Sequence, residues 1–169
     1  GHVGLPLAIC FAKAGKKVYL VEKTDRLGGQ VAKFDLTFPH LSSASQLIRP
    51  FIQRTENHPN IHVFLNTGIR EVTGYIGNFK STFQTVENES IELTFGNIIA
   101  AVGLKPFDPS KIDEYGYGRF PDVITSFEFE EMLANGHVLT KYGKEPRNIA
   151  IIHCVGSRNK KYHAYCSRT

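Results

Sequence analysis

The sequence lacks the features that mark several large classes of protein. No apolar run approaches the roughly 18 to 20 residues that a membrane-spanning helix needs. No basic start followed by an apolar core and a small-residue cleavage site marks a signal peptide. The 20 lysines and arginines are scattered, so the net charge of +4 includes no basic block of the kind that binds nucleic acid. These absences predict a soluble globular protein with no transmembrane segment and no nucleic-acid partner.

Cysteine is also scarce. Three cysteines cannot all pair, which argues against a disulfide framework and favours a reduced compartment, so the chain is predicted to be cytoplasmic. The sequence offers no Ser-His-Asp set and no metal-ligand spacing that would support a hydrolase. Its 169 residues suffice for one domain with a part of a second.

The opening segment has the pattern of a helix followed by a strand that ends in an acid. Apolar residues recur at helical spacing over residues 5–12, and Gly15 closes the helix. Residues 18–21 then form a short apolar run before Glu22. A helix and a strand in this order are two parts of a dinucleotide-binding βαβ unit.

The glycines that precede this helix support the same interpretation. Gly1 and Gly4 fit the second and third glycines of a G-x-G-x-x-G turn, which lets the backbone approach a pyrophosphate at a helix N-terminus. Glu22 follows Gly4 by 18 residues, close to the spacing expected for an acid that binds a ribose. The first glycine and the first strand of such a unit are absent from the sequence, so we expect a fragment.

The residues after Glu22 distinguish flavin from nicotinamide. The opening residues GHVGLPLA resemble sugar-nucleotide dehydrogenases, which bind NAD. The following E-x-x-x-R-x-G-G pattern, formed by Glu22, Arg26, Gly28 and Gly29, is instead similar to the two-dinucleotide-binding flavoproteins. In those proteins the acid holds the adenosine ribose and the paired glycines let the chain turn beside FAD.

The middle of the chain has the order of elements found in FAD domains. A helix with Leu47, Ile48, Phe51 and Ile52 on one face is expected, with Ser42 or Ser43 as its N-cap and an end near residues 57–59. A strand over 61–65 is expected to follow it. Residues 69–95 predict a three-stranded meander. A buried strand over 97–102 is then expected to return to the sheet, and the turn after it, Ala101-Val102-Gly103, is predicted to approach the cofactor again.

The last third predicts one helix and one further strand. Thr125 and Glu128 have the spacing of a capping box, and Asn135-Gly136 stops the helix. Residues 148–154 read as a buried strand that begins a second nucleotide-binding half. The Ser157-Arg158 turn after it could meet a phosphate, although a plain strand-to-loop turn is slightly favoured.

Several longer stretches resemble one family, the A subunits of heterodisulfide reductases and their relatives. The resemblance covers nearly the whole chain, and these stretches carry it: KVYLVEK (17–23), LGGQVAKFDLTFPHL (27–41), TGYIGNFK (73–80), 106–133, IAIIHCVGSR (149–158) and YCSR (165–168). It implies a flavin-carrying electron-transfer subunit of an oxidoreductase that acts on sulfur groups. FAD would relay electrons between iron–sulfur clusters, and the implied partners are other electron-transfer subunits that carry such clusters.

The chain departs from the family at its cluster sites. Many members have Asp-Cys-Ser-Ala-Cys where this chain has residues 42–46, so two cluster-ligand positions fall on Ser43 and Gln46. The ferredoxin-like insert that many members carry after the GNFK segment is missing. Cys154 and Cys166 match the first two cysteines of a later cluster motif, whereas a cubane cluster takes four thiolates. We therefore expect no metal in this chain alone, with Cys154 and Cys166 as half of a possible cluster site in a full-length protein.

The cysteines also have ordinary structural explanations. Cys10 is predicted to be a small buried hydrophobe on the apolar face of the first helix. Cys154, at the end of the strand over 148–154, would be a second buried thiol, and His153 a strand residue without a ligand role.

The predicted fold is therefore α/β, a Rossmann-like two-dinucleotide-binding flavoprotein fold with a three-stranded β-meander. Its first strand is missing and its second nucleotide-binding half is truncated. We expect a partial FAD-binding domain over 1–109, a connecting segment over 110–147 and the start of the second half over 148–169. The residues predicted to bind FAD are Gly1, Gly4, Glu22, Arg26, Gly28, Gly29, Ala101 and Gly103.

Two other functions compete with FAD-dependent electron transfer. A truncated product could keep the fold but perform no chemistry by itself, and the chain alone is expected to be inactive. An NAD-dependent sugar-nucleotide dehydrogenase would explain GHVGLPLA, but the RLGG pattern and the meander argue against it.

Overall fold

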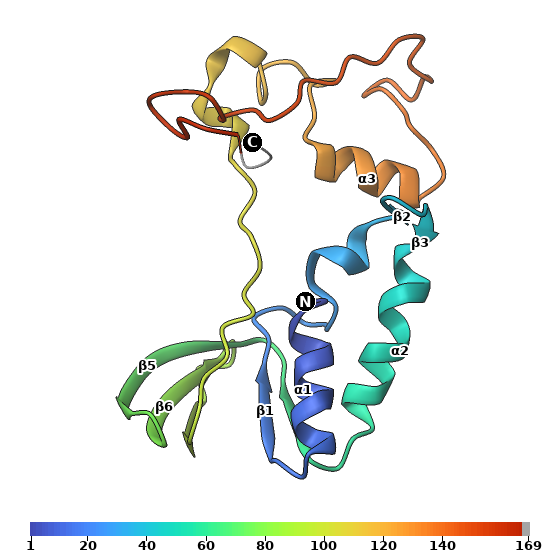
Figure 1. The fold of residues 1–169 in the computed structure, drawn as a ribbon. Helices are drawn as coiled ribbons and strands as arrows, with labels where there is room; N and C mark the ends of the chain where they lie inside the picture. Colours follow the sequence, from blue (N-terminus) through green and yellow to red (C-terminus); the bar gives the residue numbers. More distant parts are fainter. Residues whose placement is uncertain (167–169) are drawn as a thin grey trace. The chain divides into compact units, whose positions relative to one another are not determined.

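The computed structural model describes residues 1–166 (Figure 1). Residues 167 and 168, which end the YCSR stretch, lie outside the described residues. The chain divides into two compact units, residues 1–103 and the residues from Leu104 onward. Among the described residues, no helix combines the length and the apolar character needed to cross a membrane.

The first unit begins with the predicted helix and strand, α1 (Gly4–Lys13) and β1 (Val18–Val21). The buried side chains of α1 recur at helical spacing, so they form one stripe along the helix: Leu5, Ala8, Ile9 and Ala12. Cys10 lies off this stripe and is exposed, so the prediction that it is buried is wrong. The helix winds about 100° per residue, which turns Cys10 away from the buried Ile9 beside it.

The segment after β1 forms a short 3₁₀ helix, a small hairpin and a second long helix. These elements are η1 (Gly29–Lys33), β2 (Leu36–Thr37), β3 (Ser42–Ser43), α2 (Ala44–Glu56) and β4 (Ile61–Phe64). Ser43 is the N-cap of α2, and its hydroxyl accepts a hydrogen bond from the Gln46 N–H at 3.4 Å, as predicted for this helix start. β1 and β4 pair in parallel, with Val18 opposite Ile61 and Val21 opposite Phe64. Helix and strand therefore alternate as in a βαβ arrangement.

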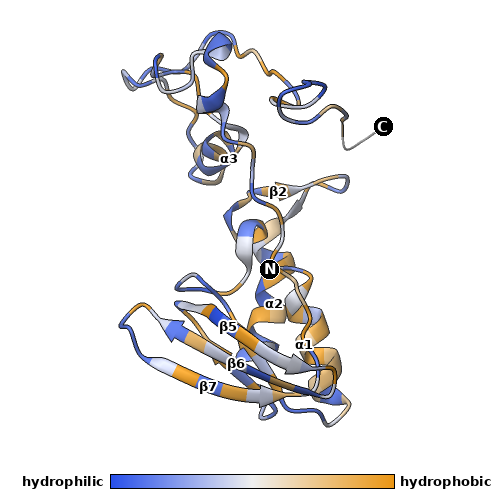
Figure 2. Ribbon diagram, turned by 90° about the vertical axis from the view of Figure 1, so that its left-hand side faces the viewer, coloured by the Kyte–Doolittle hydropathy of each residue, from blue (hydrophilic) through white to orange (hydrophobic). Residues whose placement is uncertain are grey.

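The predicted meander is confirmed. β5 (Thr67–Tyr75), β6 (Asn78–Thr85) and β7 (Ser90–Phe95) form an antiparallel three-stranded sheet. Hydrophobic and polar residues alternate along its strands (Figure 2). The Phe95 ring contacts Phe79 and Phe83 on one face, with centroid distances of 6.3 and 6.4 Å. Such alternation suits a sheet with one face toward the protein and one toward solvent.

These elements form layers within the first unit. The β1–β4 sheet lies between the helices α1 and α2 on one side and the meander on the other (Figures 1 and 2). Ala8, Ala12 and Ile61 belong to one cluster of buried side chains, and Leu5, Leu27 and Ile48 make a second. Leu20 and Phe51 pack against both clusters, so the two form a continuous core between the helices and the sheet.

The predicted returning strand over 97–102 does not form in the structure. These residues have no regular secondary structure, and Ile98, Ile99 and Val102 are 45%, 52% and 92% exposed. An extended segment becomes a strand only when its backbone groups pair with a neighbour. β1 pairs with β4, and within residues 1–166 no strand pairs with residues 97–102.

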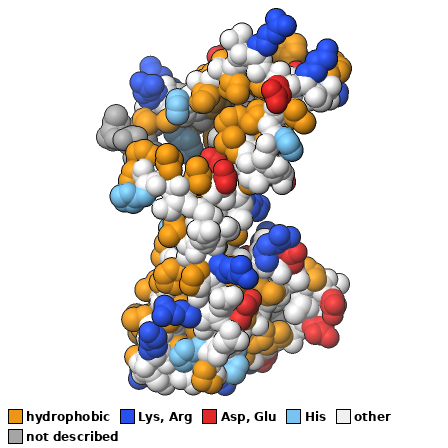
Figure 3. Space-filling view, turned by 90° about the vertical axis from the view of Figure 1, so that its right-hand side faces the viewer, with side chains coloured by type: hydrophobic (Ala, Val, Ile, Leu, Met, Phe, Trp, Pro, Cys, Tyr) orange, Lys and Arg blue, Asp and Glu red, His pale blue; other side chains and the backbone are white. Residues whose placement is uncertain are grey.

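The second unit contains little regular structure. Its elements are η2 (Pro109–Lys111), η3 (Asp113–Tyr115) and α3 (Ser126–Ala134). The predicted capping box is present, because the Thr125 hydroxyl accepts from the Glu128 N–H and the Glu128 carboxylate accepts from the Thr125 N–H. Hydrophobic side chains lie open on the surface of this unit (Figure 3).

The predicted strand over 148–154 is wrong. These residues are irregular, Ile151 is 68% exposed, and Cys154 is an exposed turn residue with φ of +58°. His153 lies in the same exposed turn and is no strand residue. Residues 148–154 have the apolar composition of a buried strand, but no strand among the described residues pairs with them. The three-part division predicted from sequence, with boundaries after residues 109 and 147, remains a prediction.

Candidate functional site

Three backbone segments meet at the N-terminal end of α1, and glycines lie where they touch. A Cβ built on Gly29 would lie 2.9 Å from the Gly1 Cα, closer than real Cβ contacts allow. A Cβ built on Gly4 would lie 3.3 Å from the Ala101 Cβ. Residues predicted to share a site thus come together from the start of the chain, from the RLGG loop and from the 101–103 turn (Figure 1).

Two further predicted glycines have backbone conformations that favour glycine. Gly28 has φ of +111°, and a Cβ there would lie 2.8 Å from the Ala32 Cβ. Gly103 has φ of +72° with open space around its missing side chain. Both conformations are rarely adopted by residues with a side chain. The chain can therefore turn sharply at both places without a clash.

The N-terminus of α1 lies beside these glycines and suits a negatively charged group. The N-cap residue Val3 makes no side-chain capping hydrogen bond, and no acidic residue occupies the first turn. In the first turn of α1 the Leu5 N–H already donates to the Gly1 carbonyl at 3.3 Å and Pro6 has no N–H, which leaves the Gly4 N–H and the positive potential of the helix dipole for such a group. An anionic group such as a phosphate would be stabilised at this position.

Glu22 follows β1, and its carboxylate is held by a local turn. The Thr24 N–H donates to the Glu22 Oε1 at 3.0 Å, and the Thr24 hydroxyl lies within the same distance of that oxygen. The backbone of Glu22 continues the sheet, because its N–H donates to the Phe64 carbonyl at 2.9 Å. The side chain is half-buried, and Oε2 accepts no hydrogen bond from within residues 1–166. Glu22 thus presents one oriented carboxylate oxygen at the end of a strand.

Arg26 is paired with the neighbouring Asp25 and is not a free cation. Its Nε donates to the Asp25 Oδ1 at 3.1 Å and its Nη2 to Oδ2 at 3.4 Å, in a pair that is well exposed. The hydrogen bond from Arg26, together with its positive charge, holds the pKa of Asp25 below its ordinary value. Arg26 would have to exchange this neighbour for a phosphate in order to bind one.

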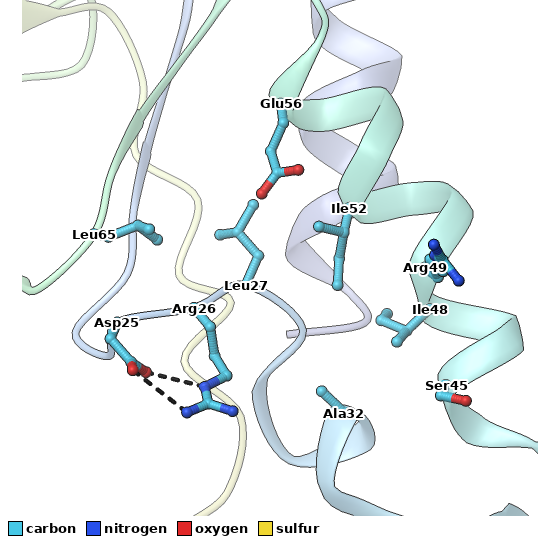
Figure 4. Close-up of a pocket in the computed structure, with 10 residues that line it drawn as sticks. All are labelled: Asp25, Arg26, Leu27, Ala32, Ser45, Ile48, Arg49, Ile52, Glu56 and Leu65. Carbon is cyan, nitrogen blue, oxygen red and sulfur yellow. Dashed lines mark hydrogen bonds and ion pairs between the residues drawn. The ribbon is translucent and has the colours of Figure 1, made fainter.

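A hollow of about 370 Å³ lies between the RLGG loop and α2 (Figure 4). Its wall is apolar along Leu27, Ile48 and Ile52, and the Asp25–Arg26 pair lies at its edge. Arg49 and Glu56 add one charge of each sign from α2. None of the glycines predicted to bind FAD lines this hollow. Leu27, which does line it, comes directly before Gly28 and Gly29 in the RLGG loop.

The positions where the family has cluster cysteines serve a structural role here. Ser43 and Gln46 form the hydrogen bond that starts α2, and the Ser43 hydroxyl lies 3.0 Å from that of Ser45. Hydroxyl and amide groups are poor ligands for iron–sulfur clusters, which are held by thiolates. No group of three or more His, Cys, Asp or Glu side chains among residues 1–166 could hold a metal ion.

The structure brings Cys154 and Cys166 together in the second unit, with 3.8 Å between their Sγ atoms. The turn between them is local, because the Ser157 N–H and hydroxyl donate to the Cys154 carbonyl at 2.9 and 2.8 Å. Arg158 is exposed. Ser157, in the turn that could meet a phosphate, therefore already has the Cys154 carbonyl as its hydrogen-bond partner.

Two residues with a clear role were not singled out from the sequence. Thr24 orients the Glu22 carboxylate, and its position two residues after an acid was a usable signal, because hydroxyl residues often make such local turns. Phe107 packs against residues about 50 positions further along the chain, and no local pattern predicts that contact.

The fold of part of the chain agrees with that of a solved structure. L-proline dehydrogenase from P. horikoshii matches 61% of this chain and 21% of its own, with a TM-score of 0.54 and 17% sequence identity. At that identity the likeness concerns the fold alone. The chain has the predicted α/β, Rossmann-like fold.

No family model matches the sequence, but individual proteins do. The iron-sulfur A subunit 1 of CoB–CoM heterodisulfide reductase from Methanopyrus kandleri is 31% identical over 255 residues that include 99% of this chain. The A subunit of the H₂:CoB–CoM heterodisulfide,ferredoxin reductase from Methanothermobacter marburgensis is 28% identical over 250 residues. The chain is thus similar to heterodisulfide reductase A subunits over nearly its whole length, which confirms the resemblance drawn from its motifs.

Both relatives are longer than this chain. It spans about 38% of the length of both relatives. The aligned 255 residues exceed the 169 of this chain, so the first relative carries residues within the matched span that have no counterpart here.

Proposed function

We propose that this chain is the FAD-binding part of an electron-transfer oxidoreductase similar to the A subunits of heterodisulfide reductases. The observation that carries the proposal is the convergence of Gly1, Gly4, Gly29 and Ala101 at the N-terminus of α1. Close approaches of bare backbone at one helix N-terminus suit a dinucleotide, whose pyrophosphate needs N–H donors and no side chains in its way.

The residues present fit such a cofactor. The first turn of α1 would hold the pyrophosphate between Gly1 and Gly4, and the Glu22 carboxylate would accept a hydrogen bond from the adenosine ribose. Gly28, Gly29 and Gly103 would allow the loops beside them to come close. Bound FAD supplies one- and two-electron transfer, which the side chains of this chain do not provide. The chain's own contribution is to bind and orient the group.

The remaining parts of the function follow from the relatives. Their names describe subunits of enzymes that act on a heterodisulfide. We infer that the whole protein works with other electron-transfer subunits that carry iron–sulfur clusters and acts on a sulfur-containing substrate. The absent ferredoxin-like insert and the Ser43 and Gln46 replacements mean that electrons would reach this flavin from clusters elsewhere.

The test is a titration of the purified chain with FAD, followed by flavin absorbance and fluorescence after desalting. Glu22→Ala should weaken binding by about ten- to a hundredfold, since a hydrogen bond to a charged group contributes about 1.5–3 kcal/mol. Glu87→Ala, in the exposed turn after β6, is the matched control and should leave the affinity unchanged.

Three results would count against the proposal. A folded chain that takes up no FAD would favour a product that keeps the fold without its chemistry. Tighter binding of NAD than of FAD would favour the dehydrogenase interpretation of GHVGLPLA. Equal affinities of the parent and Glu22→Ala would assign Glu22 to the Thr24 turn alone.

A further inference from the structure

The turn that follows β1, residues 22–26, uses one oxygen of the Glu22 carboxylate and leaves the other. The Thr24 N–H donates to the Glu22 Oε1 at 3.0 Å, and the Thr24 hydroxyl lies 3.0 Å from the same oxygen. A carboxylate oxygen has about two acceptor sites, so these two donors occupy both sites of Oε1. Oε2 accepts no hydrogen bond from within residues 1–166, so it is the oxygen that remains for a ligand.

The backbone of this turn is fixed to the end of the sheet. The Glu22 N–H donates to the Phe64 carbonyl at 2.9 Å, and the Glu22 carbonyl accepts from the Thr67 N–H at 3.0 Å. The Thr24 carbonyl accepts from the Asn66 N–H at 2.9 Å. With the backbone held at both residues, the freedom left to the carboxylate is rotation about its own side-chain bonds, and long side chains lose entropy when that rotation stops.

The Thr24 hydroxyl also connects the carboxylate to the RLGG loop. It lies 3.0 Å from the Arg26 carbonyl as well as from the Glu22 Oε1. A hydroxyl has one hydrogen, so it donates to one of these acceptors at a time, and the charged carboxylate is the stronger acceptor. Arg26 stands two residues before Gly28. One side chain therefore links the acid and the loop that are both predicted to contact the cofactor.

We propose that Thr24 is a positioning residue for the cofactor, because it holds Oε1 and thereby presents Oε2 to the adenosine ribose in one orientation. This inference rests on the proposed function, since it takes FAD as the ligand. Thr24 acts through Glu22 and need not touch the cofactor. Ordering the carboxylate before the ligand arrives lowers the entropy cost of binding. The contribution of Thr24 should be smaller than that of Glu22, because Thr24 is exposed and its N–H persists when the side chain is changed.

The first experiment is a titration of the full 169-residue chain with FAD, followed by flavin fluorescence. Thr24→Val keeps the shape of the side chain but removes the hydroxyl, and it should weaken FAD binding by about three- to tenfold. Thr24→Ser returns a hydroxyl and should bring the affinity back to within about twofold of the parent. Thr94→Val, at an exposed position on β7, is the matched control and should leave the affinity unchanged.

A double-mutant cycle separates positioning from a general effect on the fold. In a Glu22→Ala chain there is no carboxylate to hold, so adding Thr24→Val should have no further effect on FAD affinity. If Thr24 acted only by stabilising the turn, Thr24→Val would weaken binding by the same factor in both chains.

A second measurement needs no FAD. Hydrogen exchange at the Thr24 amide, followed by NMR, should be faster in Glu22→Ala than in the parent, because the parent amide donates to the Glu22 carboxylate. Thr94→Val should leave the exchange rate at Thr24 unchanged.

Three results would overturn the role of Thr24 while FAD binding itself stands. They are equal affinities of the parent and Thr24→Val, an equal loss from Thr24→Val in the Glu22→Ala chain, and a Thr24 amide that exchanges as fast in the parent as in Glu22→Ala. A folded parent chain that takes up no FAD would instead contradict the proposed function, and the role of Thr24 with it.

Discussion

The two compact units of the chain differ in where their apolar side chains lie. In residues 1–103, Leu5, Leu27 and Ile48 are at most 5% exposed and pack together between helices and sheet. In the described residues 104–166, Ile112 is the only buried hydrophobic side chain, with an exposed fraction of 9%. Ile151 in the same unit is 68% exposed.

The difference shows two ways in which a chain gains order. The first unit joins elements that are far apart in sequence through one core, which is the main source of stability in globular domains. The second unit relies on capping hydrogen bonds, turns and the packing of Phe107. We therefore expect core substitutions to be severe in the first unit and mild in the second, with local hydrogen bonds more important in the second.

The largest expected effect is a loss of stability, and it is tested by the same substitution at two isoleucines, one in each unit. Ile48→Ala should lower the free energy of unfolding of the first unit by about 2–5 kcal/mol, because it leaves a cavity in the core. Ile151→Ala should change stability by no more than about 0.5 kcal/mol, because its side chain is mostly exposed. Denaturant unfolding of each variant measures both. Similar losses would mean that Ile151 is buried in solution and that the two units do not differ as described.

A pair of glycines tests the close approach at α1. Gly29 and Gly143 have φ of +61° and +72°, but only Gly29 lies against another backbone segment. Gly143→Ala should cost about 1–3 kcal/mol from the left-handed backbone alone. Gly29→Ala should cost more and should also weaken FAD binding, since the methyl group would push Gly1 away. Unfolding curves and flavin titrations check this, and equal behaviour of the two variants would argue against a tight glycine contact.

The capping box should contribute to the second unit on a smaller scale. Thr125→Ala removes the hydroxyl that caps α3 and should lower the free energy of unfolding by about 0.5–2 kcal/mol. The helical signal in circular dichroism should fall with it. Ser126→Ala, one position later and exposed, is the control. If the Thr125→Ala chain were as stable as the control, the Thr125 cap would not contribute to the stability of this unit.

The same capping box predicts a pH dependence. Burial alone would raise the pKa of Glu128, but hydrogen bonds from the Thr125 N–H and hydroxyl and from the Tyr117 hydroxyl outweigh it and hold the pKa below its ordinary value of 4.5. A lowered pKa in the folded state stabilises the unit above the unfolded pKa. This stabilisation should be lost as the pH falls from about 4.5 through the folded value. Glu128→Gln should flatten the acid side of the stability profile.

The smallest expected signal is that of bound iron after an attempt to build an iron–sulfur cluster into this chain. Anaerobic reconstitution of this chain with iron and sulfide should leave it without a stable cluster, because Cys154 and Cys166 supply two of the four thiolates that a cubane needs. Iron analysis and electron paramagnetic resonance measure the outcome. About four irons per chain with a reducible signal would show that the two cysteines are part of a complete site.

The elements predicted correctly are those with short-range signals. Ser43 and Thr125 start helices, Gly15 follows the end of one, and the strand-like pattern from Ile69 to Phe95 marks the meander. Each signal depends on hydrogen bonds or side-chain periodicity within a few residues, so it can be recognised without knowledge of the rest of the fold.

The two wrong strands, over 97–102 and 148–154, have apolar composition but no paired neighbour in the described structure. Cys10 and Cys154 were predicted to be buried, and both are exposed. Burial of Cys10 depended on which face of α1 meets the sheet, and burial of Cys154 depended on a strand that does not form. Composition indicates that a side chain is suited to a core, but it does not supply the core.

The sequence by itself determined the local order of this protein: the helix starts, the turns, the meander and the motifs that resemble heterodisulfide reductase A subunits. Only the tertiary structure decided which distant residues meet, such as Gly1 with Gly29, Gly4 with Ala101, and Phe107 with Gly156. Local structure follows from bonds and periodicity over a few residues. A contact between distant segments depends on how every element between them packs, and no short pattern contains that information.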